Sequence, residues 1–108
     1  MSLWRVDYTE EAENDLSDIY NYISNSLLAP DNADGQVERI MQAVDELDHM
    51  PLRYETYPDE PWHSMGMRQM TVDNYSVLYY PHEESQVVGI IRIMYSPSDK
   101  SSRIRNKR

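Results

Sequence analysis

The clearest pattern of apolar and polar positions lies between residues 65 and 96, where apolar runs alternate with short polar segments. The runs Tyr75 to Tyr80 and Val87 to Tyr95 are rich in Val, Ile and Tyr, which suit a half-buried pleated strand. A third run, Met65 to Val72, leads into Asp73-Asn74, a pair that tolerates positive φ in a tight hairpin. The pattern predicts three strands in an antiparallel meander.

Strict alternation along the last of these strands assigns its side chains to two faces. Ile91, Ile93 and Tyr95 would share one face, and Ile90, Arg92 and Met94 would share the other. Since both faces are largely apolar, this strand is expected at the centre of the sheet rather than at an edge.

The N-terminal half begins with a short alternating segment, Trp4 to Thr9, which predicts a first strand. Thr9 can cap a helix from about Glu10 to Ser26, whose first turn is acidic as the helix dipole favours. Apolar residues at spacings of three and four predict the buried stripe of this helix: Ala12, Leu16, Ile19, Ile23 and Leu27.

A second helix is predicted after the break at Pro30, with Asp31 or Asn32 as its cap and Pro51 at its end. Gly35 disfavours the helix interior by about 1 kcal/mol relative to Ala, so a late start is expected. Its apolar stripe consists of Val37, Ile40, Val44 and Leu47. The short connection predicts an antiparallel helix hairpin.

The order of elements predicts an α+β, two-layer fold in a single domain spanning residues 1–108. It would contain an N-terminal strand, the antiparallel helix hairpin and the three-stranded antiparallel meander. Residues 52–64, which include two prolines and Trp62, are expected to form an irregular loop that packs on the body.

The formal net charge of −9 argues against unassisted non-specific binding to nucleic acid, which depends on neutralising phosphates. A basic tail at about residues 100–108 has the opposite sign and contains Lys100, Arg103, Arg105, Lys107 and Arg108. This tail is either a solvated terminus or an arm that meets phosphate or an acidic partner.

The composition also bears on the cellular setting. The chain has no Cys, which excludes disulfides and thiolate metal sites. No apolar run approaches the roughly 20 residues of a membrane span, and the N-terminus shows no signal-peptide pattern. We expect a cytoplasmic protein with no membrane contact.

Sequence motifs for a phosphate-binding loop, a zinc helix, a calcium loop or a serine elbow are absent, so neither a cofactor nor a metal site is expected. Arg68 stands in a Met-rich strand, where it either pairs with an acid or offers bidentate contacts to a phosphate. Arg92 lies in the strongest apolar strand, where its stem packs while its head reaches water or an acid on the second helix.

Tyr95 ends the last strand at a rim where ligands often bind, although a tyrosine at the edge of the core would look the same. His63 lies in the irregular loop as a candidate base, with Glu55 beside it as a second candidate base. Surface exposure without function is the simpler interpretation of both.

The ordered set of these features resembles the RelE/ParE superfamily, toxins of bacterial type II toxin–antitoxin systems that are often labelled plasmid stabilisation proteins. The similarity covers nearly the whole chain, from helix one and the Leu47 to Pro51 segment to the strands with Gly66-x-Arg68 and Ile91-Arg92-Ile93. It implies a compact toxin that a cognate antitoxin neutralises, with operator DNA bound only through the toxin–antitoxin complex.

Two branches of this superfamily have different targets. RelE-like toxins enter the ribosomal A site and cut mRNA, whereas ParE-like toxins poison DNA gyrase and are not nucleases. For RNA cleavage the resemblance implies that Arg68 holds the phosphate, Tyr95 orients or donates a proton, and Glu55 or His63 acts as base. The further cations expected to bind substrate are Arg53, Arg92, Lys100 and Arg103.

Two departures from the pattern bear on the choice. RelE-like nucleases usually carry a basic surface for the ribosome, and their common ending has two arginines that are absent from Tyr95-Ser96-Pro97-Ser98-Asp99. The leading hypothesis is a ribosome-dependent mRNA endonuclease that inhibits translation, because Arg68 and Tyr95 are present. The alternatives are a ParE-like gyrase inhibitor without catalysis and a degenerate, non-toxic module that only binds a partner.

Overall fold

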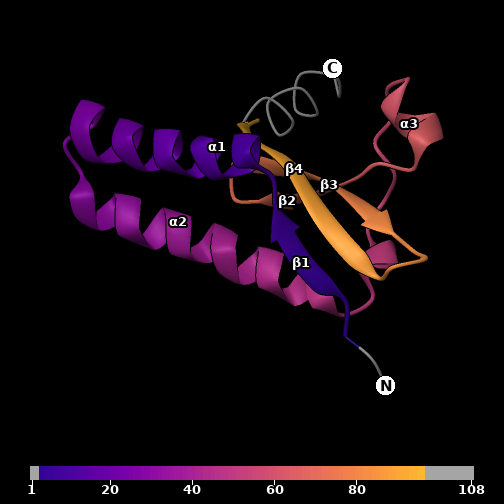
Figure 1. Cartoon of the computed structure of the whole chain (residues 1–108). Helices are drawn as coiled ribbons and strands as arrows, with labels where there is room; N and C mark the ends of the chain where they lie inside the picture. The colour runs from indigo at the N-terminus through magenta and orange to yellow at the C-terminus, as the bar shows by residue number, and fades with distance from the viewer. Residues whose placement is uncertain (1–2, 97–108) are drawn as a thin grey trace, which may run out of the picture.

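A four-stranded sheet forms one layer of the protein in the computed structural model, which describes residues 3–96. Its order is β1-β4-β3-β2 (Figure 1), with β1 at Arg5–Tyr8, β2 at Arg68–Val72, β3 at Tyr75–His82 and β4 at Val87–Tyr95. Strands β2, β3 and β4 form an antiparallel meander, and β1 adds to β4 in parallel. The predicted meander and the central position of the last strand are confirmed.

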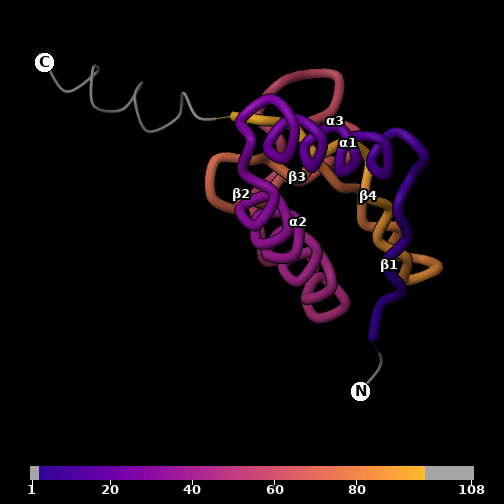
Figure 2. Tube along the Cα trace, turned by 90° about the vertical axis from the view of Figure 1, so that its left-hand side faces the viewer, coloured from indigo at the N-terminus to yellow at the C-terminus, as the bar shows by residue number. Residues whose placement is uncertain are grey.

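The second layer is a helix hairpin. Helix α1 (Glu10–Asn21) continues into a π-helical turn, η1 (Tyr22–Ser26), and α2 (Pro30–Asp45) returns antiparallel and ends in the 3₁₀ turn η2 (Glu46–Asp48). The predicted cap is confirmed, because the Thr9 hydroxyl accepts a hydrogen bond from the Ala12 N–H at 3.1 Å. The closed end of the hairpin projects beyond the sheet in Figure 1 and faces the viewer in Figure 2.

The start of α2 differs from the prediction. The helix begins at Pro30 itself, its cap residue is Ala29, and no side chain of Asp31 or Asn32 caps it. Proline suits the first helical position because its fixed φ is already helical and the N–H it lacks would have no partner there. Gly35 lies inside the helix and does not delay its start.

The core lies between the two layers. Its fully buried residues come from both helices and the central strands, and include Ala12, Ala33, Ile40, Val44, Leu47, Val77, Tyr79, Val88 and Ile90. The apolar stripes of the two helices pack there against the apolar face of β3 and β4.

The assignment of faces along β4 is wrong at its middle. Leu78 pairs with Arg92 but Tyr79 pairs with Ile90, so Ile91 is an extra residue in a β-bulge. A bulge shifts the alternation by one residue, and Ile90 consequently joins Ile93 on the helix-facing side of the sheet. Both are buried, at 0% and 2% exposure.

The segment between α2 and the meander is largely irregular, as predicted, but contains the short turns η3 (Pro51–Arg53) and α3 (Trp62–Met65). The expected start of β2 at Met65 is wrong, because Met65 still belongs to α3. Gly66 ends that turn with φ of 89°, a conformation that glycine adopts without strain. Thr56 then forms an isolated bridge with Arg68 at the outer edge of β2.

Helix α1 completes the edge of β4 that the short strand β1 leaves uncovered. β1 pairs with β4 only as far as Ile90. Beyond it, the Thr9 hydroxyl donates to the Ile90 carbonyl at 2.8 Å, and the Asp15 carboxylate accepts from the Ile93 N–H at 2.9 Å.

None of the helices formed by residues 3–96 has the length and apolarity to cross a membrane.

Candidate functional site

A groove of about 770 Å³ opens where the closed end of the hairpin projects past the sheet. Its walls come from the end of α1 with η1, the start of α2, the β2–β3 turn and the last residue of β4. The aliphatic and aromatic residues that line it are Ile19, Tyr22, Ile23, Leu27, Tyr75 and Tyr95. The groove is therefore built by segments that lie far apart in the sequence.

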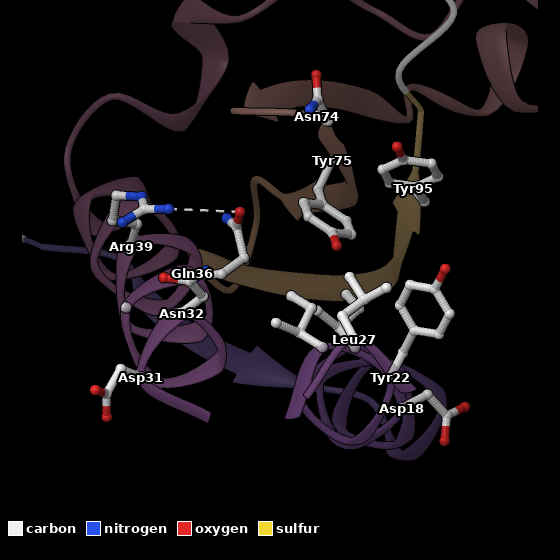
Figure 3. A pocket seen from close by; sticks show the side chains of 13 residues that line it. Asp18, Tyr22, Leu27, Asp31, Asn32, Gln36, Arg39, Asn74, Tyr75 and Tyr95 are labelled. Atoms are coloured by element: carbon white, nitrogen blue, oxygen red, sulfur yellow. Dashed lines mark hydrogen bonds between the residues drawn. The ribbon is translucent and has the colours of Figure 1, made fainter. Parts of the chain in front are cut away.

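Burial divides these residues into a floor and an exposed rim. Ile19, Ile23 and Tyr75 are buried, whereas Tyr22, Leu27 and Tyr95 are 57%, 55% and 64% exposed. The rings of Tyr75 and Tyr95 lie 5.4 Å apart, and Figure 3 shows Tyr22 on the same side of the groove. Large apolar side chains exposed together in a concave surface mark a site for a partner or ligand.

The opposite side of the groove is polar and firmly held. The Arg39 Nε donates to the Asp73 carboxylate at 2.8 Å, and the Gln36 amide donates to the same oxygen at 3.0 Å. Asp73 occupies the β2–β3 turn with φ of 56°, as the sequence predicted for this pair. These contacts fix the middle of α2 to the turn, so the groove is a formed feature of the fold.

Arg68 lies at the other end of the meander, and its guanidinium is used inside the protein. One terminal nitrogen donates to the backbone carbonyls of Leu52 at 3.2 Å and Tyr54 at 2.5 Å. Its buried Nε has no hydrogen-bond partner among residues 3–96. The neighbouring Tyr79 hydroxyl donates to the Pro51 carbonyl at 2.5 Å, so the two side chains together hold the η3 turn against the sheet.

Arg53 belongs to the same cluster. Its guanidinium lies 4.7 Å from the centre of the Tyr54 ring and donates to the carbonyls of His49 and Met50. Burial raises the pKa of Tyr79 to about 12, even though the guanidinium groups of Arg68 and Arg53 oppose that change. A tyrosine held protonated in this way cannot act as a base near neutral pH.

Arg68 and Tyr95 lie on the same face of the sheet but not together. Arg68 pairs with Tyr79 across the strands and Tyr95 pairs with Tyr75. Four strand positions separate the two pairs, which corresponds to about 13 Å. A single scissile phosphate therefore does not lie within hydrogen-bond reach of both side chains in this arrangement.

The two candidate bases lie near the outer edge of β2. His63 is exposed on α3, and its Nδ1 is 2.9 Å from the Tyr57 carbonyl. Glu55 is placed by its backbone carbonyl, which accepts from the Gln69 N–H at 3.2 Å. Within residues 3–96, no three His, Asp or Glu side chains are grouped so as to hold a metal ion.

Arg92 pairs with an acid as the sequence suggested, but the acid is Asp15 on α1 and not a residue of the second helix. Its Nε and a terminal nitrogen donate to the two oxygens of Asp15 at 2.8 and 3.0 Å. Partial burial raises the pKa of Asp15, but the hydrogen bonds from Arg92 and the Ile93 N–H outweigh it and leave the pKa lowered. Lys100 and Arg103 lie outside the described residues.

The sequence did not indicate which residues would line the groove. It assigned Leu27 to the buried stripe of the first helix, whereas Leu27 is exposed. The available signal was the length of that stripe, which continues to Leu27 and Leu28 beyond the part of the helix that the sheet can cover. Tyr95 was the only groove residue that the sequence singled out.

Comparison with known proteins gives one family and one fold. Residues 6–98 match the family described as the ParE toxin of the type II toxin–antitoxin system parDE. A structure from the chromosomal ParDE system of P. aeruginosa has a TM-score of 0.71 at 24% identity, with 87% of this chain and 97% of that chain covered. No curated protein matches the sequence.

Two RelE-type structures share the fold at lower similarity. The RelBE2 toxin–antitoxin complex of Mycobacterium tuberculosis gives a TM-score of 0.62 at 23% identity over 90% of this chain and 95% of that one. The isolated E. coli RelE toxin gives 0.58 at 16% identity over 96% and 97%. Because the family match spans most of its length, the chain belongs to the ParE toxin family of type II toxin–antitoxin systems.

Proposed function

We propose that this chain is the toxin of a type II toxin–antitoxin module that poisons DNA gyrase by binding it, without cleaving RNA. This is the ParE-like alternative from the sequence, and the family match supports it. The observation that carries it is the use of Arg68, whose guanidinium donates to the Leu52 and Tyr54 carbonyls and lies about four strand positions from Tyr95.

Phosphoryl transfer to a ribose 2′-OH requires a base, a cation on the phosphorane and a proton donor around one phosphate. In this chain the strand arginine stabilises a turn, Tyr79 is protonated and buried, and His63 with Glu55 belongs to the edge of β2. An inhibitor that acts by binding its target needs a complementary surface and no catalytic groups. The engagement of Arg68 and Tyr79 within the fold is compatible with that mode of action.

The groove supplies the site for the antitoxin. Its exposed aromatic and aliphatic residues leave apolar surface that a helix can cover, as in helix-in-groove recognition. Related structures were determined as toxin–antitoxin complexes, including RelBE2 of M. tuberculosis and RelBE of E. coli. The antitoxin is therefore proposed to bind across the end of the hairpin.

The test is induced expression in the absence of the antitoxin, with growth, bulk translation, mRNA integrity and plasmid supercoiling followed together. We expect growth arrest with loss of supercoiling while mRNA stays intact. Arg68→Gln is expected to keep the arrest as long as it folds. Arg5→Gln serves as the control for loss of one arginine, since the Arg5 side chain forms an exposed ion pair with Asp7 on β1.

The opposite pattern would reject the proposal. It consists of translation stopping first, mRNA cut in the reading frame of the ribosome, and an Arg68→Gln protein that is folded but no longer arrests growth. Absence of any arrest by the wild-type chain would instead favour the non-toxic binding module.

A further inference from the structure

The groove has an acidic setting that limits which helix it can bind. Of the ten basic and nineteen acidic residues in the chain, five bases and one acid follow residue 96. Residues 3–96 therefore hold five arginines against eighteen acids. The helix hairpin is more extreme, because residues 10–48 contain Arg39 as their single Lys or Arg and eleven Asp or Glu residues.

The cations of the described residues are already engaged. Arg5, Arg39 and Arg92 pair with Asp7, Asp73 and Asp15, and Arg53 and Arg68 donate to backbone carbonyls. Asp18 and Asp31 line the groove, are exposed, and have no ion pair within residues 3–96. The groove thus presents negative charge that no described residue neutralises.

The aromatic side of the groove also favours a positively charged partner. Tyr22, Tyr75 and Tyr95 come from η1, β3 and β4, and Figure 3 shows all three around the same side, with Asp18 close to Tyr22. The face of an aromatic ring attracts ammonium and guanidinium groups, and a carboxylate beside it strengthens the attraction. An arginine or lysine whose aliphatic stem packs on these rings can interact with both the ring faces and the carboxylate.

We infer that the groove binds an amphipathic helix of the antitoxin that is basic on its flanks, with aliphatic residues on the floor and Lys or Arg at Asp18 and Asp31. The inference rests on the proposed antitoxin partner and adds its chemistry. Charge complementarity selects the occupant, since an acidic helix would meet like charge along the hairpin. The apolar floor supplies the binding energy, and the flanking charges supply the selectivity.

The experiment uses two fluorescent 20-residue helical peptides that share Leu at i, i+3, i+4 and i+7 and differ only in carrying Lys or Glu on the flanks. Binding to the full chain is measured by anisotropy. The Lys peptide is expected to bind about tenfold more tightly than the Glu peptide at low salt, with a preference that shrinks as salt screens the charges. Tyr22→Ala is expected to weaken the binding of both peptides.

Two double variants with equal change in net charge locate the effect. Asp18→Lys with Asp31→Lys is expected to abolish or reverse the preference for the Lys peptide. Glu83→Lys with Glu84→Lys changes the β3–β4 turn at the far end of the sheet, about 23 Å away by strand length, and is expected to leave the preference intact. Circular dichroism confirms that each variant is folded.

Equal binding of the two peptides, a preference for the Glu peptide, or the same loss in both double variants would overturn the inference. The peptide assay does not depend on toxicity. Failure of growth arrest would therefore reject the proposed function while the peptide preference stands, and the reverse result would reject the basic helix alone.

Discussion

The two ends of the β2–β3–β4 meander have opposite characters. At one end, Arg68 and Tyr79 direct their polar atoms into the protein, onto carbonyls of the η3 turn and the residue that follows it. At the other end, Tyr22 and Tyr95 are more than half exposed around an open groove. Residues that satisfy each other stabilise the fold, whereas exposed aromatic residues are available to a partner. The comparison assigns stability to the Arg68 end and binding to the groove end.

The largest effect is expected from Tyr79→Ala at the Arg68 end. Tyr79 is fully buried, so its removal creates a cavity and should lower the free energy of unfolding by about 3–5 kcal/mol. Tyr79→Phe should lower it by about 1–2 kcal/mol, because the Pro51 carbonyl loses its partner. Urea denaturation measures both. A loss below the experimental error for Tyr79→Ala would contradict a structural role for this end.

A smaller effect of a different kind is expected at the groove end. Tyr22→Ala with Tyr95→Ala should weaken antitoxin binding by about 30-fold, or about 2 kcal/mol, since aromatic anchors dominate most interfaces. The free energy of unfolding should change by about 0.5 kcal/mol or less for each substitution, because both side chains are exposed. Calorimetry measures the affinity and urea denaturation measures the stability, both on the same preparations. Unchanged affinity would show that the antitoxin binds elsewhere.

The smallest effect concerns Asp15, which connects α1 to β4. Its pKa is lowered on folding, by the Arg92 and Ile93 hydrogen bonds acting against burial, so its contribution is present above the ordinary pKa of 3.8. That contribution is lost as the pH falls through the lower folded value. Asp15→Asn should therefore cost about 1 kcal/mol at pH 7 and less at pH 3.

Urea denaturation at the two pH values measures this difference, with Asp59→Asn, an exposed acid in the loop before α3, as the control. An equal cost of Asp15→Asn at both values would mean that the charge of Asp15 contributes nothing.

Much of the fold followed from periodicity. The apolar stripes from Ala12 to Ile23 and from Val37 to Leu47 predicted both helices, and the runs around Val77 and Ile93 predicted the meander. The bulge at Ile91 could not be predicted, because Ile90 and Ile91 are both apolar and nothing in the sequence marks the extra residue. The start of α2 was misplaced because proline breaks a helix interior yet suits its first position.

The site was much less predictable than the fold. The groove residues Tyr22 and Leu27 meet Tyr75 and Tyr95 only when the hairpin lies on the sheet, and no local pattern relates the two pairs. Arg68 attracted attention as a charge in an apolar strand, but its partners are backbone carbonyls, which have no sequence signature. Side-chain chemistry suggested the candidates, and only the fold could bring them together or keep them apart.

The parallel pairing of β1 with β4 has a consequence for the timing of synthesis. Arg5 pairs with Val87, so the first strand waits for its partner until the ribosome has added about 80 more residues. At about 5–20 residues per second, this takes on the order of 4–16 seconds. Throughout that interval the hairpin cannot cover its apolar face with the finished sheet. A nascent chain therefore cannot complete this fold before β4 has been synthesised, which gives the antitoxin several seconds in which to be ready.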